Sequence, residues 1–353
     1  MRRGLMGWNE ADLPLAALKQ RQSRLQAGLK SERLGGLIIY TNIARPAAAT
    51  FLTGFTPYWS EGLLFVPAAG EPVFATALSK RVAEWIRSVM PIGAIENTPQ
   101  PAAAIQRKLT DAGVDRVGVL ELDLLPAAQA AALAGDGKAV TLEDATALFR
   151  SIRLQVDDAE INLVRRADAL ARDCLQAIDG GSGARAMVAD IEGRARLAGA
   201  EEVFVGVNPD LARPGAFLRS DRLDDAPGAR FAVRLSLSLK GAWVRRAITQ
   251  ARLPEQQSAF TAADQAFQHA LRSGSATGAL GALQGGFPGK ITAWTVEASV
   301  GSYPLETVAR SGEGPESPLS SAIPSVSVVS AQGEIGGNPW YGAGPVIGQA
   351  QSS

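Results

Sequence analysis

One stretch in which apolar and polar residues alternate constrains the fold of this chain more than any other feature. Apolar and polar residues alternate through Phe231–Leu239 and again through Ala242–Thr249, with Lys240 and Gly241 between them. Two alternating runs separated by a two-residue turn that contains Gly predict an antiparallel β-hairpin. The chain therefore contains a two-stranded element whose two faces differ in polarity.

The predicted turn also fixes which side chains share a face. Ser236 is expected opposite Arg245, because a two-residue loop leaves a single register. One face then carries Val233, Leu235, Leu237, Leu239, Val244 and Ile248, and we expect it to pack on helices. The other face carries Arg234, Ser236, Ser238, Trp243, Arg245, Ala247 and Thr249.

The polar face of this hairpin is the first candidate for a binding site. Arg234 and Arg245 come out as diagonal neighbours, roughly 7–8 Å apart. Two guanidinium groups that are this close and partly enclosed need acidic partners or a bound anion. The alternative is that this face is solvated and that both arginines are ordinary surface residues.

The first part of the chain alternates between predicted strands and helices. We expect a helix over 15–33, buried strands at Leu37–Tyr40 and Arg116–Leu120, a hairpin of Glu61–Val66 with Pro72–Ala75, and a helix in the 80s. This alternation predicts an α/β domain with a mostly parallel or mixed sheet. The domain is expected to end near Ser151–Gln155.

The second part opens with a long predicted helix. Its apolar stripe comprises Ile161, Val164, Ala167, Ala171, Cys174 and Ile178, and Gly180–Gly181 is expected to end it. A second helix is predicted over Asp190–Ala198 and a strand over Val203–Val207. Residues 312–353 are rich in Gly, Ser and Pro, so they predict weakly patterned strands or irregular chain.

The composition argues against several classes of function. Lys+Arg and Asp+Glu both number 35, whereas nucleic-acid binders usually carry a basic excess. The apolar runs are too short to span a membrane, and no signal-peptide pattern is present, so we expect a cytoplasmic protein. Cys174 and His269 are the only residues of their types. We interpret both as structural, and so few thiolate and imidazole ligands predict no cofactor of the zinc or iron kind.

Several short motifs together resemble a known family. They are Arg24-Leu25, Gly36–Tyr40, Phe51–Phe55, Glu61–Val66, Val117–Val119, Ile152-Arg153, Glu160-Ile161, Glu192, Arg196, Gly199-Ala200, Gly206 and Asn208. In order and spacing they are similar to the creatinase, aminopeptidase P and prolidase family. The resemblance implies an α/β creatinase-like N-terminal domain over 1–154 and an α+β pita-bread domain over 155–353. It also implies a homodimer.

The chain departs from this family where the resemblance would place metal ligands. Arg234 and Arg245 stand at the positions of two metal-binding aspartates, and Ala298 stands at that of a histidine. Leu305 replaces a further histidine, Glu306 remains, and no acidic residue matches the last two glutamates, around Val328 and in the Gly-rich tail. An arginine offers no lone pair to a cation. We therefore expect no metal ion.

Two functions remain open. The first is a metal-independent hydrolase or lyase that acts on a small carboxylate-bearing amide or amino-acid derivative. Its expected catalytic residues are Glu306 and Tyr303, with Glu297 as a further candidate, and its substrate-binding residues are Arg234, Arg245, Trp243 and Ser236. The second is a pseudoenzyme of the same fold that serves as a binding or scaffold module.

Overall fold

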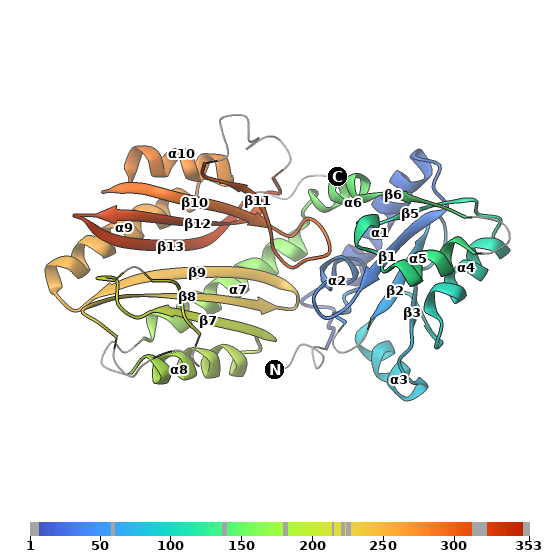
Figure 1. Ribbon diagram of the computed structural model, residues 1–353, viewed down its shortest axis with the longest axis horizontal. Helices are drawn as coiled ribbons and strands as arrows, with labels where there is room; N and C mark the ends of the chain where they lie inside the picture. The colour runs from blue at the N-terminus through green and yellow to red at the C-terminus, as the bar shows by residue number, and fades with distance from the viewer. Residues whose placement is uncertain are drawn as a thin grey trace. The chain divides into compact units, whose positions relative to one another are not determined.

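The structure is a computed structural model, and it describes residues 7–57, 61–135, 140–178, 183–213, 215–219, 223, 227–312 and 323–348. They form two compact units (Figure 1). The first unit comprises the chain up to Gln155 together with Ser299–Glu306. The second unit comprises Val156–Ala298 and the chain from Thr307 onward. No pattern in the sequence indicated that Ser299–Glu306 would cluster with the first unit.

A mixed sheet forms the centre of the first unit. Within the described residues its strands lie in the order β4 (Ala94–Asn97), β3 (Val73–Thr76), β2 (Gly62–Pro67), β1 (Gly36–Thr41), β5 (Arg116–Val119) and β6 (Thr141–Asp144). The pairs β1–β2 and β2–β3 are antiparallel, whereas β3–β4, β1–β5 and β5–β6 are parallel. The predicted α/β class, the mixed sheet and the hairpin of β2 with β3 are thus confirmed.

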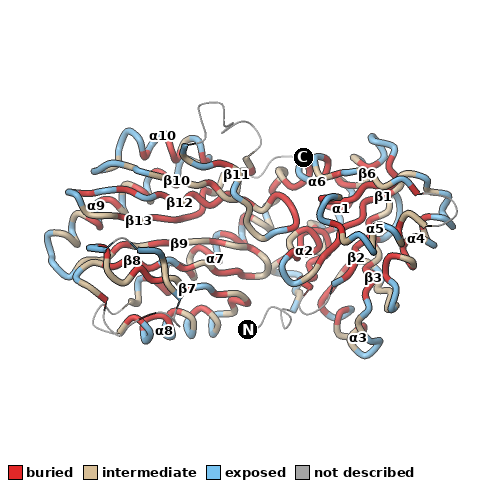
Figure 2. The backbone as a smooth tube through the Cα atoms, in the orientation of Figure 1, coloured by how far each residue is buried: buried red, intermediate tan, exposed pale blue. Residues whose placement is uncertain are grey.

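Helices cover both faces of this sheet. One face packs against α1 (Leu15–Ser31), α2 (Ala47–Thr53), α3 (Lys80–Val89) and α6 (Thr146–Arg153). The other packs against α4 (Pro101–Asp111) and α5 (Ala127–Ala134). Every residue of β1 is buried, as expected for a central strand with helices on both sides, and Figure 2 shows this burial along the strand.

A long antiparallel sheet forms the second unit. Its described strands lie in the order β11 (Glu306–Arg310), β10 (Lys290–Ala298), β12 (Val326–Ile335), β13 (Asn338–Ile347), β9 (Ala242–Ala251), β8 (Arg230–Leu239) and β7 (Glu202–Asn208). One face packs against α7 (Asp158–Gln176), α8 (Ala184–Leu197), α9 (Pro254–Leu271) and α10 (Ala276–Gly286). Figure 1 looks onto the sheet with α7 and α9 behind it.

The predicted hairpin of β8 and β9 is confirmed in its register. Leu239 pairs with Ala242 and Ser236 pairs with Arg245. The turn residues Lys240 and Gly241 both have positive φ, 53° and 80°, which suits the right-handed twist of a two-residue hairpin. Sequence reasoning missed the residue that holds this turn.

That residue is Glu201, whose buried carboxylate accepts hydrogen bonds from three groups of the hairpin. The backbone N–H groups of Lys240 and Gly241 donate over 3.0 and 2.7 Å, and the hydroxyl of Ser238 donates over 2.6 Å. Desolvation raises the pKa of Glu201, and these hydrogen bonds oppose that rise. The turn is therefore fixed by a carboxylate from outside the hairpin.

The tail of the chain is more regular than its composition predicted. Residues 326–335 and 338–347 form the long strands β12 and β13, which pair along their whole length. Residues 313–322 and 349–353 lie outside the described residues. The long helix α7 agrees with its predicted stripe, although Gly180–Gly181 also lies outside the described residues, and α8 begins six residues earlier than predicted. In the described chain, no helix is long and apolar enough to cross a membrane.

Candidate functional site

The face of the second sheet that lies away from its helices carries the predicted binding residues, and we call it the arginine face. Directly paired residues on neighbouring strands share a face. One row across this face consists of Gly206, Arg234, Ala247, Ala343, Ser330 and Thr295. Arg234 is the only large residue in this row, so small side chains extend from it across four strands. Among them, the buried hydroxyl oxygen of Ser330 has no hydrogen-bond partner among the described residues.

A neighbouring row places the second arginine. Phe204, Ser236 and Arg245 are successive partners on β7, β8 and β9. Nε of Arg245 donates to the hydroxyl of Ser236 over 3.0 Å, and its Nη1 forms an ion pair with Glu297 of β10. The two charged side chains are only 20% and 14% exposed. Arg245 is thus held at both ends of its guanidinium group.

Arg234 differs from Arg245 in its surroundings. Its guanidinium carbon lies 4.7 Å from the centroid of the Phe217 ring, so the side chain packs on an aromatic face. No described residue forms a hydrogen bond or ion pair with this guanidinium. Although the residue as a whole is exposed, desolvation lowers the pKa of Arg234, the charge of Arg245 lowers it further, and Glu297 opposes both. Among the residues that the structure describes, Arg234 is therefore a cation without a fixed acidic partner.

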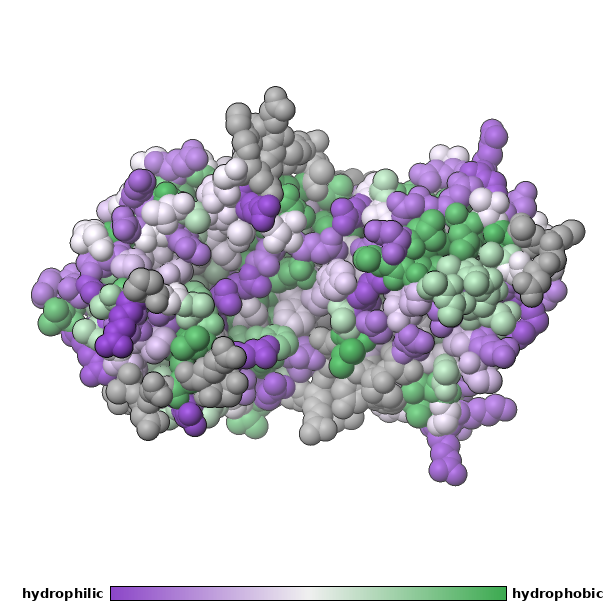
Figure 3. Space-filling view, viewed as in Figure 1, coloured by the Kyte–Doolittle hydropathy of each residue, from purple (hydrophilic) through white to green (hydrophobic). Residues whose placement is uncertain are grey.

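The other two predicted binding residues lie on the same face. Ser236 contacts Arg245, as described above, and Trp243 is two residues along β9 from it. The Trp243 ring stacks on Phe204, with centroids 6.0 Å apart and an interplanar angle of 18°. Figure 3, which looks onto this face, shows hydrophobic and hydrophilic side chains side by side over β7–β9. The structure thus brings the four residues together, and their part in binding stays a prediction.

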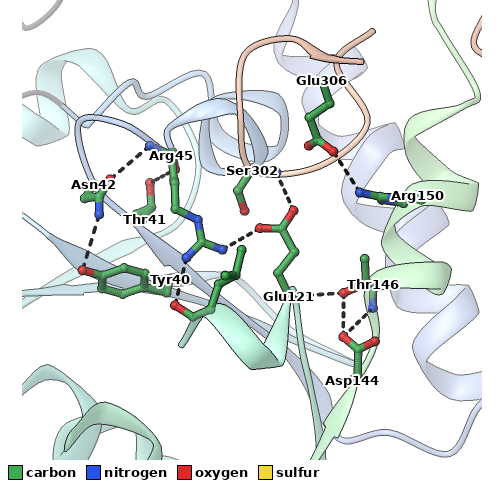
Figure 4. A network of polar contacts seen from close by, with 11 residues as sticks. Tyr40, Thr41, Asn42, Arg45, Glu121, Asp144, Thr146, Arg150, Ser302 and Glu306 are labelled. Carbon is green, nitrogen blue, oxygen red and sulfur yellow. Dashed lines mark hydrogen bonds and ion pairs between the residues drawn. The ribbon is translucent and has the colours of Figure 1, made fainter. Parts of the chain in front are cut away.

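The two predicted catalytic residues lie in the segment that clusters with the first unit. Oε2 of Glu306 accepts a hydrogen bond from Nη2 of Arg150 over 2.8 Å (Figure 4), while its buried Oε1 has no partner among the described residues. Desolvation raises the pKa of Glu306, Arg150 lowers it, and the nearby charge of Glu121 raises it. Tyr303 is 40% exposed, and its ring lies under the guanidinium of Arg45. Their catalytic role stays a prediction.

Glu121 anchors this segment to the first unit, and sequence reasoning missed it. Its carboxylate accepts from Nη2 of Arg45 over 2.5 Å and from the backbone N–H of Ser302 over 3.2 Å (Figure 4). The N–H of Ala47 donates to the carbonyl of Ser302 over 2.9 Å. Glu121 itself has a φ of 54°, a costly backbone for a residue with a side chain. The sequence predicted only the strand that ends just before Glu121.

The residues at the positions implied for a divalent metal do not fit such an ion. Two of these positions are occupied by the cationic side chains of Arg234 and Arg245, and a third by the buried methyl group of Ala298. The nearby carboxylate, Glu297, is already paired with Arg245, and Val328 lies opposite it on β12. Among the described residues, no group of three or more His, Cys, Asp or Glu could hold a metal ion.

Comparison with known proteins agrees with this fold. Residues 21–155 match the Creatinase/Prolidase N-terminal domain. An Xaa-Pro dipeptidase from Bacillus anthracis has a TM-score of 0.66 at 15% identity, over 94% of this chain and 95% of that one. A prolidase from Pyrococcus horikoshii has a TM-score of 0.65 at 13% identity, over 95% and 97%. Dipeptidase PepE from Mycobacterium ulcerans has a TM-score of 0.58 at 19% identity, over 95% and 94%.

These similarities confirm the predicted architecture. The first part of the chain is a creatinase-like α/β domain, and the second is an antiparallel-sheet domain of the pita-bread kind found in prolidases. No curated protein matches the chain in sequence. At identities of 13–19%, the solved structures show a shared fold and leave the chemistry of this chain to its own residues.

Proposed function

We propose that this chain uses a prolidase-like fold, without a metal ion, to bind a small carboxylate-bearing ligand on its arginine face. The observation that carries the proposal is the contrast between two neighbouring guanidinium groups. Arg245 is held by Glu297 and Ser236, whereas Arg234 has no acidic partner among the described residues. A carboxylate bound bidentately by Arg234 would supply that missing charge.

The surroundings of Arg234 favour an anion of small size. Ala247 and Ala343 follow it across the row, so the side chains in that direction are small, whereas Phe217 packs on one side of its guanidinium. A guanidinium without an acidic partner among the described residues, beside small side chains, thus favours a small anion.

What happens to the bound ligand divides the proposal into two candidates. The first is hydrolysis or elimination of a small amide or amino-acid derivative, with Glu306 and Tyr303 as catalytic residues. The second is binding without reaction, as in a pseudoenzyme. The engagement of Glu297 by Arg245 and of Glu306 by Arg150 supports the second, because both carboxylates already hold an arginine and are less available to a substrate. Incubation with a panel of N-acyl and dipeptide carboxylates, followed by mass spectrometry, separates the two.

Substitution of Arg234 tests the binding proposal directly. Arg234→Ala should weaken the binding of acetate or inorganic phosphate, measured by ligand-observed NMR, by about ten-fold or more, as for a lost charge-assisted hydrogen bond. Arg272→Ala is the matched control, because Arg272 is also exposed but lies at the end of α9, on the helix side of the sheet. Equal affinities for both variants and the parent protein would remove the basis for the proposal.

Metal independence has its own test. Elemental analysis after gentle purification should find no stoichiometric zinc, manganese, cobalt or iron, and chelation should leave the unfolding temperature unchanged. One or two equivalents of such a metal would contradict this part of the proposal. We further propose a cytoplasmic homodimer, in line with the family resemblance and the single cysteine, and sedimentation velocity at several concentrations tests the dimer.

A further inference from the structure

We infer that the ligand carries a planar aromatic group next to its carboxylate, and that Phe204 is the residue that selects it. This inference rests on the proposed carboxylate site and extends it to a class of ligand. It starts from an aromatic pair on the arginine face, in which the exposed Phe204 stacks on the partly buried Trp243. The inferred ligand is an aryl carboxylate of the size of phenylacetate.

The exposure of Phe204 makes this pair unusual. The ring is 47% exposed. The residues on either side of it in β7, Val203 and Val205, point to the other face of the sheet and are buried. One side of the ring stacks on Trp243, at an interplanar angle of 18°. Because the ring is 47% exposed despite this stacking, part of its surface is available to a further flat group. Offset stacking on such a ring is favourable beyond the burial of apolar area alone.

The register places this open ring beside the arginines. Phe204 is paired with Ser236, the residue whose hydroxyl accepts from Arg245. Gly206, two residues along β7 on the same face, is paired with Arg234. Diagonal neighbours across a pair of strands are about 7–8 Å apart. That span matches a carboxylate joined to a six-membered ring through one or two bonds, so a single small molecule can reach both groups.

Phe217, the aromatic residue next to Arg234, already packs against several neighbours. Phe217 lies against the backbone of Gly206. A Cβ atom added to Gly206 would come within 3.1 Å of the Cβ atom of Phe217. The face of its ring carries the guanidinium of Arg234, and Tyr341 packs edge-on against it at a centroid distance of 5.2 Å. Phe217 thus orients Arg234, whereas Phe204 offers the open stacking surface.

The charges of the face restrict the ligand further. Arg234 has no acidic partner among the described residues, so the position beside it favours anions over neutral or cationic aromatic molecules. An aliphatic carboxylate of equal volume would keep the ionic contact with Arg234 but lose the stacking on Phe204. Aromaticity and charge are therefore separable in an experiment.

The test compares four probes, namely phenylacetate, cyclohexylacetate, acetate and phenylacetamide, by ligand-observed NMR on the full chain. Phenylacetate should bind most tightly and phenylacetamide least. Phe204→Ala should weaken phenylacetate by about three- to ten-fold, the range expected for one stacked ring, and leave acetate unchanged. Arg234→Ala should weaken both carboxylates. Leu253→Ala is the matched control, since Leu253 is also 47% exposed but precedes α9.

The possible failures are distinguishable. If Arg234→Ala weakens phenylacetate and Phe204→Ala does not, the aromatic inference is wrong and the carboxylate site stands. If neither variant changes any affinity, or if no probe binds, both proposals fail. If Phe204→Ala instead alters the sedimentation coefficient, the aromatic pair is a contact between copies of the chain and the inference is overturned.

Discussion

Arginine side chains on the two faces of the β8–β9 hairpin have very different partners. Arg245 and Arg246 are consecutive residues, so strand alternation sends them to opposite faces. On the helix-covered face, Arg246 forms a bidentate ion pair with Asp168 of α7, over 2.6 and 2.8 Å, and also donates to Gln268 of α9. Its side chain is 7% exposed. On the arginine face, Arg245 has one carboxylate and one hydroxyl, whereas Arg234 has neither within the described part of the chain.

This difference separates a structural charge from charges that are available to a ligand. A buried guanidinium is tolerated only when nearby acceptors satisfy it, and Arg246 has acceptors on two helices. On the arginine face, Arg234 and Arg245 are close enough to repel, and Glu297 is paired with Arg245, which is unfavourable for Arg234 unless water or an anion intervenes. The helix-covered face is therefore complete without a ligand, whereas the arginine face is not.

The largest expected effect comes from breaking the completed pair. Asp168→Ala leaves the charge of Arg246 buried and without its carboxylate, so we expect the free energy of unfolding to fall by about 3–5 kcal/mol. Urea unfolding, followed by circular dichroism, measures the change. The paired substitution Asp168→Leu with Arg246→Met should recover most of the loss, because it removes both charges and keeps the volume.

An exposed ion pair of α8 provides the control. Asp190 and Arg194 are bonded over 2.7 Å, but their side chains are 48% and 52% exposed. Asp190→Ala should change the free energy of unfolding by less than about 1 kcal/mol. If Asp168→Ala costs no more than this, the pair with Arg246 does not have the buried character that the comparison requires.

A second carboxylate on the helix-covered face should make stability depend on pH. Asp264 of α9 accepts a hydrogen bond from Nε1 of Trp340 over 2.8 Å, but the described residues offer it no cation. Desolvation raises the pKa of Asp264 to about 7, and the indole hydrogen bond opposes the rise. Because this pKa is above that of the unfolded chain, folding is favoured most when the group is protonated. Stability should therefore be full below about pH 4 and fall as pH rises through 7.

Asp264→Asn isolates this contribution. The amide keeps an acceptor for Trp340 but carries no charge, so the pH-dependent loss between about pH 4 and 7 should shrink by about 4 kcal/mol, at about 1.4 kcal/mol per pKa unit. Thermal unfolding of the parent and the variant in matched buffers measures it. Parallel pH profiles for the two proteins would show that the carboxyl group of Asp264 does not carry the dependence.

The same comparison shows where the sequence was sufficient. The register of β8 and β9 followed from alternation and a two-residue turn, because both are local. The apolar pattern also predicted which face of the hairpin meets helices. That interpretation overlooked Arg246, which lies among the apolar residues of β9, and Asp168, which lies in the apolar stripe of α7. Two opposite charges on two stripes that must pack together indicate a buried ion pair, so this signal was available.

Other features depended on neighbours that are distant in the sequence. Gly342 and Gly344 made β13 look like irregular chain, yet both glycines lie in a regular strand. A side chain at Gly342 would collide with Trp340, and one at Gly344 would collide with Leu271 and approach Arg246. Their small size serves packing, which composition does not reveal. The clustering of Ser299–Glu306 with the first unit likewise depends on Glu121, some 180 residues earlier.

The smallest expected effect on stability comes from a substitution on the arginine face itself. Glu297→Gln removes the acid that competes with a ligand for Arg245, while the amide oxygen still accepts a hydrogen bond. We expect a loss of only about 1 kcal/mol in stability, because the side chain of Arg245 retains Ser236 and some contact with water. Anion affinity should rise about five-fold, since one unit of negative charge near the site disappears.

Titration of acetate into Glu297→Gln, with Glu334→Gln as the control, measures this rise. Glu334 is an exposed acid at the far end of β12, so its loss changes the net charge equally without touching Arg245. The rise should shrink at high salt for both variants, but only Glu297→Gln should retain a gain at 0.5 M salt, where charges beyond a few ångströms are screened. Equal gains for the two variants would mean that overall charge, rather than the release of Arg245, governs binding on this face.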